Sequence, residues 1–175
     1  MDWNKAKKSL VLLFVLINLI LATIIVVTIS EDTIDKQTIQ NTIIALRQRN
    51  VEVKANIPSK IPSVGTFKLI GELKKEDTVD FVGEAKFKRE YEGVQRLEQN
   101  QSVSPAHNVL LKNFVKSEKV RVIESIEIGY LKKNMMIEDV GVMFIPVWRI
   151  ALQSGEKLYY NAFSADLVTV YTGDL

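Results

Sequence analysis

The sequence predicts an α+β protein in which one N-terminal transmembrane helix is followed by helices packed on an antiparallel sheet. Three observations lead to this prediction. Residues 10–29 form a long apolar stretch without a charge, and residues 33–49 space their apolar side chains as an amphipathic helix does. From residue 119 onward, apolar residues alternate as they do in strands. Helices followed by consecutive strands indicate a sheet with one face packed against helices.

The apolar stretch is long enough to cross a bilayer as a helix. At about 1.5 Å per residue, residues 10–29 reach roughly 30 Å, the thickness of the hydrocarbon core. The charges on its two sides differ in sign: Lys5, Lys7 and Lys8 precede it, and Glu31, Asp32 and Asp35 follow it. The positive-inside rule therefore places residues 1–9 in the cytoplasm as a short tail and the chain after residue 29 outside the cell.

A cleaved secretory signal is the competing interpretation of residues 10–29. Such a signal has a shorter apolar region, of about 7 to 15 residues, and small residues around its cleavage site. Ala22 is the only alanine in the stretch, and a bulky residue lies two positions after it. The sequence therefore favours an uncleaved anchor in the cell membrane.

One polar residue, Asn18, lies in the middle of the expected span. Helical steps of four residues place Phe14, Asn18 and Ala22 on one stripe. An amide in hydrocarbon gains about 0.6 to 2 kcal/mol from a hydrogen bond to another helix, and a small residue one turn away lets that helix approach. Trp3 lies where a membrane-interface aromatic ring is expected. These four residues are the predicted partner-binding residues, although so apolar a span also tolerates a single asparagine.

The 146 residues after the span are enough for one domain or for two small lobes. They carry 20 basic and 20 acidic residues, because three of the 23 basic and one of the 21 acidic residues precede the span. This balance gives no reason to expect a nucleic-acid partner. The absence of cysteine excludes disulfides, thiolate zinc sites and cysteine nucleophiles. The polar stretch 98–104 is the expected boundary between a first lobe, residues 30–100, and a second lobe, residues 101–175.

The first lobe is expected to begin with a helix. Thr33 is the predicted N-cap, and Asn50 is expected to end the helix in the left-handed conformation. Residues 51–53 and 66–70 alternate as strands do, with a proline-containing loop between them. The remaining expected elements are a short helix within residues 73–83 and a hairpin of residues 85–91 and 94–97 around Glu92-Gly93.

The second lobe is expected to open with a helix and to continue with strands. Ser104 is the predicted N-cap, and Pro105 suits the first helical position, where its missing N–H costs nothing. Turns are expected at residues 154–155 and 164–166, which have the composition of turns. The predicted strands are residues 120–123, 126–131, 140–152, 157–163 and 167–171.

No group of residues predicts a catalytic or metal site. Ser154 and Lys157 have the Ser-x-x-Lys spacing of some serine acyltransferases, but there the motif begins a helix, whereas here it falls in a turn. His107 is the only histidine and is expected at the surface. The acidic pairs Glu76-Asp77 and Glu138-Asp139 are expected to be solvated. We therefore expect no enzymatic activity, no metal and no cofactor.

Two parts of the chain are similar to a known family. Residues 1–7, Met-Asp-Trp-Asn-Lys-Ala-Lys, and the Phe-Val-Leu-Ile-Asn run at 14–18 resemble the start of the YycI family. Pro146-Val147-Trp148-Arg149 and Tyr159-Tyr160-Asn161-Ala162 are similar to the Pro-x-Trp and Tyr-x-Asn-Ala strands of its last domain. Members of this family are membrane-anchored regulators associated with the WalK sensor histidine kinase of Gram-positive bacteria.

The resemblance implies a non-enzymatic accessory regulator of a cell-envelope two-component system. Such a protein modulates a WalK-type kinase, beside a YycH-like protein, through membrane helices and exported domains, the last of which is PepSY-like. The chain is shorter than the family members that it resembles, which implies a reduced exported segment. The residues carried over are Trp3 and Asn18 at the membrane and Pro146, Trp148, Tyr160 and Asn161 in the last strands, the second group being expected to serve the fold.

Two other functions stay open from the residues alone. A single-pass scaffold for envelope assembly or cell division would share the anchor and the lack of catalytic groups. An exported serine hydrolase acting through Ser154 and Lys157 is the other alternative, and a serine-reactive probe would label it.

Overall fold

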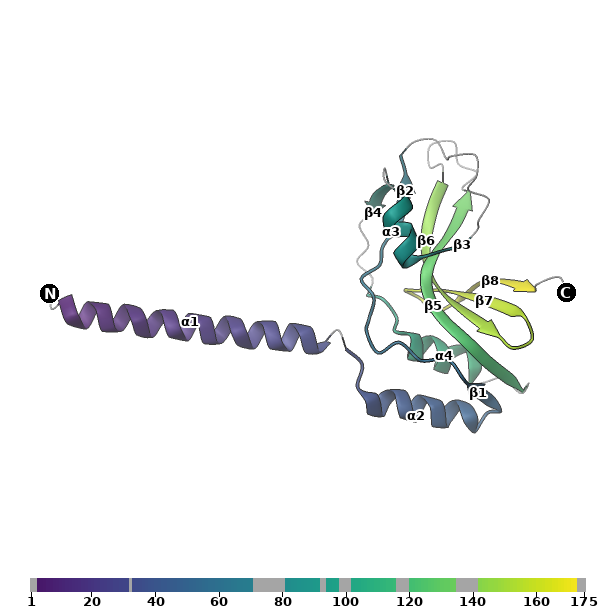
Figure 1. Cartoon of the computed structure of the whole chain (residues 1–175), viewed down its shortest axis with the longest axis horizontal. Coiled ribbons are helices and arrows are strands. Elements are labelled where there is room, and N and C mark those ends of the chain that lie inside the picture. The colour runs from purple at the N-terminus through teal and green to yellow at the C-terminus, as the bar shows by residue number, and fades with distance from the viewer. Residues whose placement is uncertain are drawn as a thin grey trace. The chain divides into compact units, whose positions relative to one another are not determined.

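The computed structural model of the chain describes residues 3–31, 33–70, 81–91, 94–97, 102–115, 120–134 and 142–172. These residues belong to two compact units, Met1–Ile34 and Asp35–Leu175. The first unit is a single long helix, and the second is an α+β domain with a mixed sheet (Figure 1).

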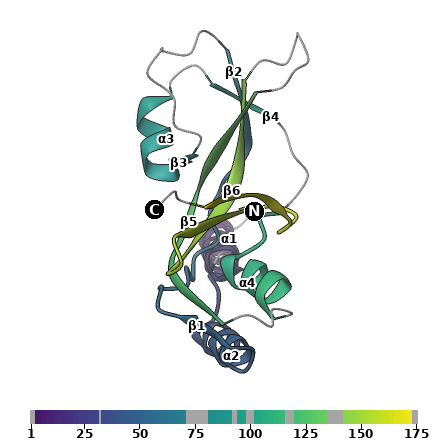
Figure 2. The same ribbon diagram turned by 90° about the vertical axis from the view of Figure 1, so that its right-hand side faces the viewer.

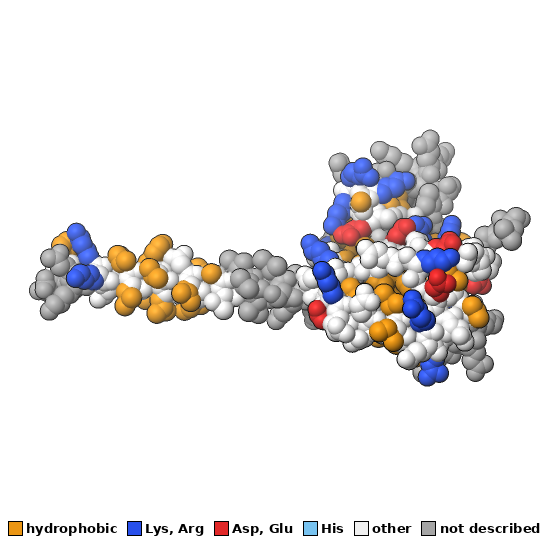
Figure 3. Space-filling model, turned by 60° about the horizontal axis from the view of Figure 1, so that its bottom comes forward, with side chains coloured by type: hydrophobic (Ala, Val, Ile, Leu, Met, Phe, Trp, Pro, Cys, Tyr) orange, Lys and Arg blue, Asp and Glu red, His pale blue; other side chains and the backbone are white. Residues whose placement is uncertain are grey.

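Helix α1, Trp3–Glu31, makes up the first unit. Its window Lys7–Ile24 has a mean hydropathy of 2.0, and none of this window is buried within the structure. Figure 3 shows hydrophobic side chains along the middle of the helix and basic side chains near its N-terminal end. Helix α1 is long enough and apolar enough to cross a membrane. A signal sequence near the N-terminus would satisfy the same two criteria.

The described part of the domain contains three helices and eight strands. The helices are α2 (Lys36–Arg47), α3 (Glu84–Glu90) and α4 (Ala106–Phe114). The strands are β1 (Val51–Val53), β2 (Thr66–Leu69), β3 (Phe81–Gly83), β4 (Val94–Leu97), β5 (Arg121–Asn134), β6 (Val142–Leu152), β7 (Glu156–Asn161) and β8 (Leu167–Thr172). The predicted α+β class is therefore confirmed.

Strands β5 and β6 form a long antiparallel pair that runs through the domain (Figure 2). Near one end of this pair, β5 also pairs with β1 and β6 with β7, which in turn pairs with β8. Near the other end, β5 pairs with β3 and β6 with β2, which in turn pairs with β4. The sheet is mixed rather than purely antiparallel as predicted, because β1 runs parallel to β5.

The main core lies between one face of the sheet and the helices. Phe144, Trp148 and Ile150 project from β6 into a cluster that also holds Leu46 of α2 and Leu110 of α4, and each of these side chains is at most 1% exposed. Alternate residues of a strand point to the same face of its sheet. The apolar residues at every second position of β6 therefore determine the face on which the helices pack.

A smaller cluster lies on the opposite face of the sheet, formed by Phe81, Leu131, Val147 and Tyr159. The Phe81 ring lies over Gly129, where an added Cβ atom would come within 2.5 Å of it. The Arg149 guanidinium lies 4.4 Å from the centroid of the same ring and forms an ion pair with Glu127. The lack of a side chain at Gly129 thus lets β3 pack closely on β5.

The start of α2 differs from the prediction. The helix begins at Lys36, and its N-cap is Asp35 rather than Thr33. The Asp35 carboxylate accepts a hydrogen bond from the Gln37 N–H (3.2 Å), and an aspartate at this position also suits the positive end of the helix dipole. Asn50 follows the helix with a φ of 60°, the left-handed conformation that was predicted.

The predicted hairpin of residues 85–91 and 94–97 is wrong. Residues 84–90 form helix α3, in which the Lys88 ammonium contacts the Glu84 carboxylate one turn earlier (2.6 Å), and β4 pairs with β2 instead. Residues 81–83 form strand β3 rather than the end of a helix. The rest of that predicted helix, residues 73–80, and the turn residues Glu92 and Gly93 lie outside the described residues.

The second half of the domain follows the prediction more closely. Helix α4 begins at Ala106, with Pro105 at the N-cap position and without the predicted side-chain capping bond from Ser104. The strands expected at 120–123 and 126–131 form the single strand β5, whose register shifts between these segments. Both expected turns are present, with positive φ at Gly155 and Ala165.

The sheet takes strands from both ranges that were expected as lobes. β1 and β2 come from residues 30–100, and they pair with β5 and β6 from residues 101–175. Helix α2 likewise contacts α4. Residues 35–175 accordingly form one compact unit.

Replacement of Gly129 by alanine tests how β3 packs on β5. The added Cβ would lie 2.5 Å from the Phe81 ring and from the Val82 carbonyl oxygen, so we expect the free energy of unfolding to fall by about 1 to 3 kcal/mol. Gly83, its register partner, has no atom within 4 Å of such a Cβ, so Gly83→Ala is the matched control with the smaller loss. Urea unfolding of the full chain in detergent, followed by circular dichroism, measures both. Equal losses would contradict this packing.

Candidate functional site

All four residues expected to serve the fold lie on two paired strands, Pro146 and Trp148 on β6 and Tyr160 and Asn161 on β7. The register sets Trp148 directly opposite Tyr160, as cross-strand partners. The Trp148 indole N–H donates to the Ser104 carbonyl oxygen (2.9 Å), which attaches the segment before α4 to the sheet. The Pro146 carbonyl oxygen accepts a hydrogen bond from the Ala162 N–H (3.0 Å). These contacts connect the sheet to α4 and to the end of β7.

Asn161 shapes the turn between β7 and β8. Its side-chain oxygen accepts hydrogen bonds from the N–H groups of Phe163 (2.8 Å) and Ser164 (3.1 Å). Such an Asx turn satisfies backbone donors within a loop. The carbonyl oxygen of Ala165 then accepts a hydrogen bond from the Asn113 side chain of α4 (2.8 Å). The turn is thereby attached to the helix.

Burial suppresses ionisation of the tyrosines in the core. Tyr160 is 4% exposed, and its burial raises the pKa of the hydroxyl to about 12. Tyr130 is 1% exposed, and burial together with the charge of Glu84 raises its pKa to about 12 as well. Both phenols therefore stay neutral at physiological pH and cannot act as bases there.

The residues expected to bind a membrane partner lie on α1. Trp3 is 70% exposed and Phe14 is 67% exposed, and the Lys7 ammonium lies 5.4 Å from the centroid of the Trp3 ring. The Asn18 side-chain N–H donates to the Phe14 carbonyl oxygen (2.7 Å) one turn earlier. The second amide N–H and the side-chain oxygen of Asn18 have no partner among the described residues, and Ala22 follows one turn later.

His107 is buried, and its prediction as a surface residue is wrong. Its side chain lies in the first turn of α4, is 9% exposed, and its Nδ1 atom has no hydrogen-bond partner in the described part of the chain. Burial lowers the pKa of the imidazole below its usual 6.5, so the neutral form is favoured. The sequence did not reveal this burial, because histidine is intermediate between the residue types that are usually buried and those that are usually exposed.

Metal-ligating side chains do not gather in the described residues. No group of three or more His, Asp or Glu side chains there could hold a metal ion. The acidic pairs Glu76-Asp77 and Glu138-Asp139 lie outside the described residues.

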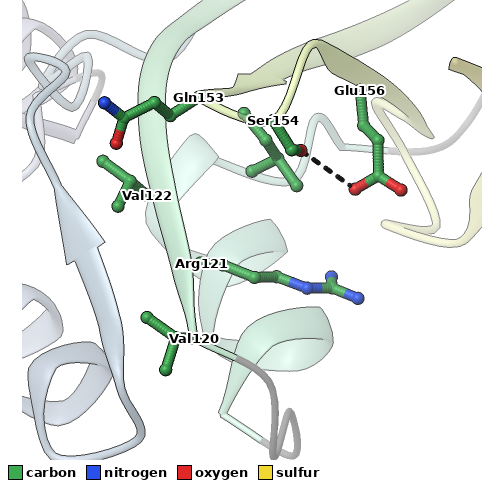
Figure 4. A pocket seen from close by; sticks show the side chains of 7 residues that line it. Val120, Arg121, Val122, Gln153, Ser154 and Glu156 are labelled. Carbon is green, nitrogen blue, oxygen red and sulfur yellow. Dashed lines mark hydrogen bonds between the residues drawn. The ribbon is translucent and has the colours of Figure 1, made fainter.

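A hollow of about 420 Å³ lies beside the turn that carries Ser154 (Figure 4). The Ser154 hydroxyl donates to the Glu156 carboxylate (3.3 Å), and within the described residues no hydrogen bond joins it to Lys157. Figure 4 shows the Arg121 side chain extending on the side of β5 where Ser154 and Glu156 lie, and its guanidinium is 5.5 Å from the centroid of the Phe114 ring. The described geometry therefore pairs the Ser154 hydroxyl with a carboxylate and not with Lys157, the residue that the Ser-x-x-Lys spacing would require.

A second hollow, of about 500 Å³, lies between α2 and the loop after β1. Lys36 and Gln40 of α2 line one side, and Lys60 lines the other. Ile39 and Ile57 contribute apolar surface. Sequence analysis did not identify this hollow, because its sides come from segments about twenty residues apart.

Strand β8 is an exposed sheet edge that sequence analysis also missed. Among the described strands it pairs only with β7. Proteins usually protect such edges with charges or proline, but residues 167–172 contain neither, whereas the shorter strands β1 and β4 carry Glu52 and Arg96. Its apolar side chains with exposed fractions between 38% and 52% are Leu167, Val168, Val170 and Tyr171. The composition was visible in the sequence, but the position of the strand at an edge was not.

Comparison with protein-family models, with curated proteins and with solved structures found no match to this chain. The resemblance to the YycI family therefore remains an expectation that rests on the residues quoted for it.

Replacement of Asn161 by alanine removes the acceptor for two backbone N–H groups. Each lost hydrogen bond costs about 0.5 to 1.5 kcal/mol, so we expect the free energy of unfolding to fall by about 1 to 3 kcal/mol. Asn161→Asp keeps the acceptor oxygens and is the matched control, with a smaller expected loss. Urea unfolding measures both variants, and the same loss in both would show that these hydrogen bonds do not stabilise the turn.

His107 makes stability depend on pH. In the unfolded chain the imidazole takes up a proton near pH 6.5, whereas burial resists this protonation in the folded chain. Protons therefore favour the unfolded state, and stability is lost as the pH falls below about 6.5. We expect His107→Gln to lose less stability than the natural chain between about pH 7.5 and about pH 5.5. Urea titrations at the two pH values measure this difference, and an unchanged pH dependence would contradict it.

Proposed function

We propose that this protein is a single-pass membrane protein, with its N-terminus in the cytoplasm, that acts as a non-enzymatic accessory regulator of a cell-envelope two-component system. It binds a WalK-type sensor histidine kinase and a YycH-like protein through its membrane helix and its exported α+β domain. A contact that is more favourable in one kinase state than in the other shifts the kinase toward that state.

Helix α1 carries this proposal. All of its apolar side chains that the structure describes are exposed, and one amide lies among them at Asn18. Lipid covers apolar side chains well, but it offers no hydrogen-bond partner to the second N–H and the oxygen of that amide. A polar group on a neighbouring helix does, and the small Ala22 one turn away leaves room for that helix.

The domain supports the proposal as a protein-binding module. Its helices pack on one sheet face, in keeping with the PepSY-like relationship that we propose for residues 101–175. Strand β8 presents an uncharged, partly apolar edge of six residues. An extended segment of a partner protein can add to such an edge through main-chain hydrogen bonds, with alternate side chains setting the specificity.

Replacement of Asn18 by leucine tests the membrane contact. Loss of about 0.6 to 2 kcal/mol should weaken association with the kinase about three- to thirtyfold. Thr23→Val is the matched control, because the Thr23 hydroxyl also donates within the helix, to the Leu19 carbonyl oxygen (2.8 Å), but lies off the Asn18 stripe. Quantitative co-purification of the kinase from membranes measures both. Recovery of neither a histidine kinase nor a YycH-like protein with the natural chain would refute the proposed partners.

Replacement of Val170 by lysine tests the edge of β8. Val170 is 42% exposed, so a charge there should disrupt strand addition while the domain stays folded. We expect at least about a tenfold loss in affinity for the YycH-like partner, which corresponds to about 1.4 kcal/mol. Val120→Lys is the matched control, because Val120 is 79% exposed and lies outside β8. Equal binding by the two variants would remove β8 from the interface.

A further inference from the structure

The outward face of helix α2 carries exposed side chains in the part of the chain that the structure describes. Its opposite face packs against β1 and α4 and buries Thr42 and Leu46. Side chains spaced three or four residues apart lie on one stripe of a helix. The stripe on the outward face consists of Lys36, Gln40, Ile44 and Arg47, all exposed.

This stripe combines an exposed aliphatic side chain with basic groups on both sides. Ile44 is 55% exposed, and Lys36 and Arg47 flank it. Helix α2 contains no acidic residue, and the Asp35 carboxylate just before it is engaged as the N-cap. Among the described residues, neither basic side chain has a carboxylate partner. A basic helix face with an exposed apolar residue is typical of helices that lie on a membrane surface.

The hollow beside α2 extends this basic face. Lys36 and Lys60 both line it, together with polar side chains and an apolar surface, and the lining contains no acidic residue. Its volume of about 500 Å³ suits a small anionic headgroup with an apolar group attached. α2 lies at the bottom of the domain in Figure 1, and Figure 3 turns that side toward the viewer, where basic side chains lie beside exposed hydrophobic ones.

The connection between the last residue of α1 and the first residue of α2 is short. Four residues separate Glu31, the last residue of α1, from Lys36, the first of α2. Five Cα steps span at most roughly 17 Å. Glu31 precedes this connection, and Asp32 and Asp35 lie within it, so any attraction to an anionic surface must come from the stripe and the hollow.

We propose that the Lys36-to-Arg47 stripe and the adjoining hollow dock on the anionic lipid surface of the same bilayer that holds α1. The inference uses the proposed function only in that α1 spans this bilayer. Each basic residue near an anionic surface multiplies the docked population roughly fivefold, and the attraction acts only within a Debye length, about 8 Å at physiological salt. Docking fixes the domain close to the membrane surface.

A fluorescent label at position 44 tests the docking. The chain contains no cysteine, so Ile44→Cys gives a single attachment site for an environment-sensitive dye. The labelled full chain is reconstituted into vesicles of phosphatidylcholine alone or with about 30% phosphatidylglycerol, a fraction that sets the anionic surface potential. We expect a blue shift and protection from an aqueous quencher only in the anionic vesicles, and a loss of both in about 1 M salt.

Two variants control this experiment. Ile70→Cys places the label on another exposed isoleucine, 62% exposed, beyond the end of β2, and should not respond to the lipid. Reversal of both charges, Lys36→Glu with Arg47→Glu, should reduce the docked fraction at least about tenfold, while circular dichroism shows that the domain stays folded. An equal response at both positions, or a response that survives charge reversal, would overturn the docking.

Alkaline carbonate extraction separates failure of this inference from failure of the proposed function. Release of the chain from the vesicles would show that α1 does not span the bilayer, which overturns both. If the chain is retained but the fluorescence of the label at position 44 is the same with and without phosphatidylglycerol, the docking alone is overturned. Retention together with the lipid-dependent shift supports it.

Discussion

The antiparallel pairing of β5 with β6 is the constraint on which the rest of the domain depends. Eleven residue pairs hold the two strands together, and four other strands pair directly with one or the other of them. Side chains alternate between the two faces of the sheet, so this register also determines which side chains enter each apolar cluster. Trp148 points toward the helices and the main core, whereas Val147 points to the opposite face, into the smaller cluster with Phe81. The helices and the β7–β8 edge therefore take their places from a single pairing.

Elements with strong periodicity could be predicted from the sequence, and elements defined by distant contacts could not. Alternation in residues 140–171 predicted three strands, and the composition of residues 154–155 and 164–166 predicted both turns. Residues 84–90 contain one large apolar side chain, Phe87, so no helical face was visible, although Glu84 and Lys88 have the spacing of a stabilising pair. The parallel pairing of β1 with β5 and the burial of His107 arise only when segments far apart in the chain meet.

The candidate functional residues divide in the same way: those visible in a local stretch of sequence were predicted, and those that depend on distant contacts were not. A polar amide within a stretch of twenty uncharged, mostly apolar residues can be recognised from the sequence alone, and Asn18 was identified in this way. The edge of β8 and the hollow between Lys36 and Lys60 depend on which strand lies outermost and on which loop lies beside a helix. The proposals assign these features to three surfaces of different chemistry: the Asn18 stripe to the membrane interior, the α2 stripe and hollow to an anionic lipid surface, and the β8 edge to an extended protein segment.

Cysteine crosslinking within the membrane tests the central claim, that the Asn18 stripe contacts a helix of the kinase, most directly. Because the chain has no cysteine of its own, single cysteines at Asn18 and Ala22 can be compared with one at Ile20, which lies on the opposite side of α1. In native membranes, positions 18 and 22 should crosslink to a transmembrane helix of the sensor kinase, and position 20 should not. Equal crosslinking from all three positions, or none to the kinase from any of them, would contradict the claim.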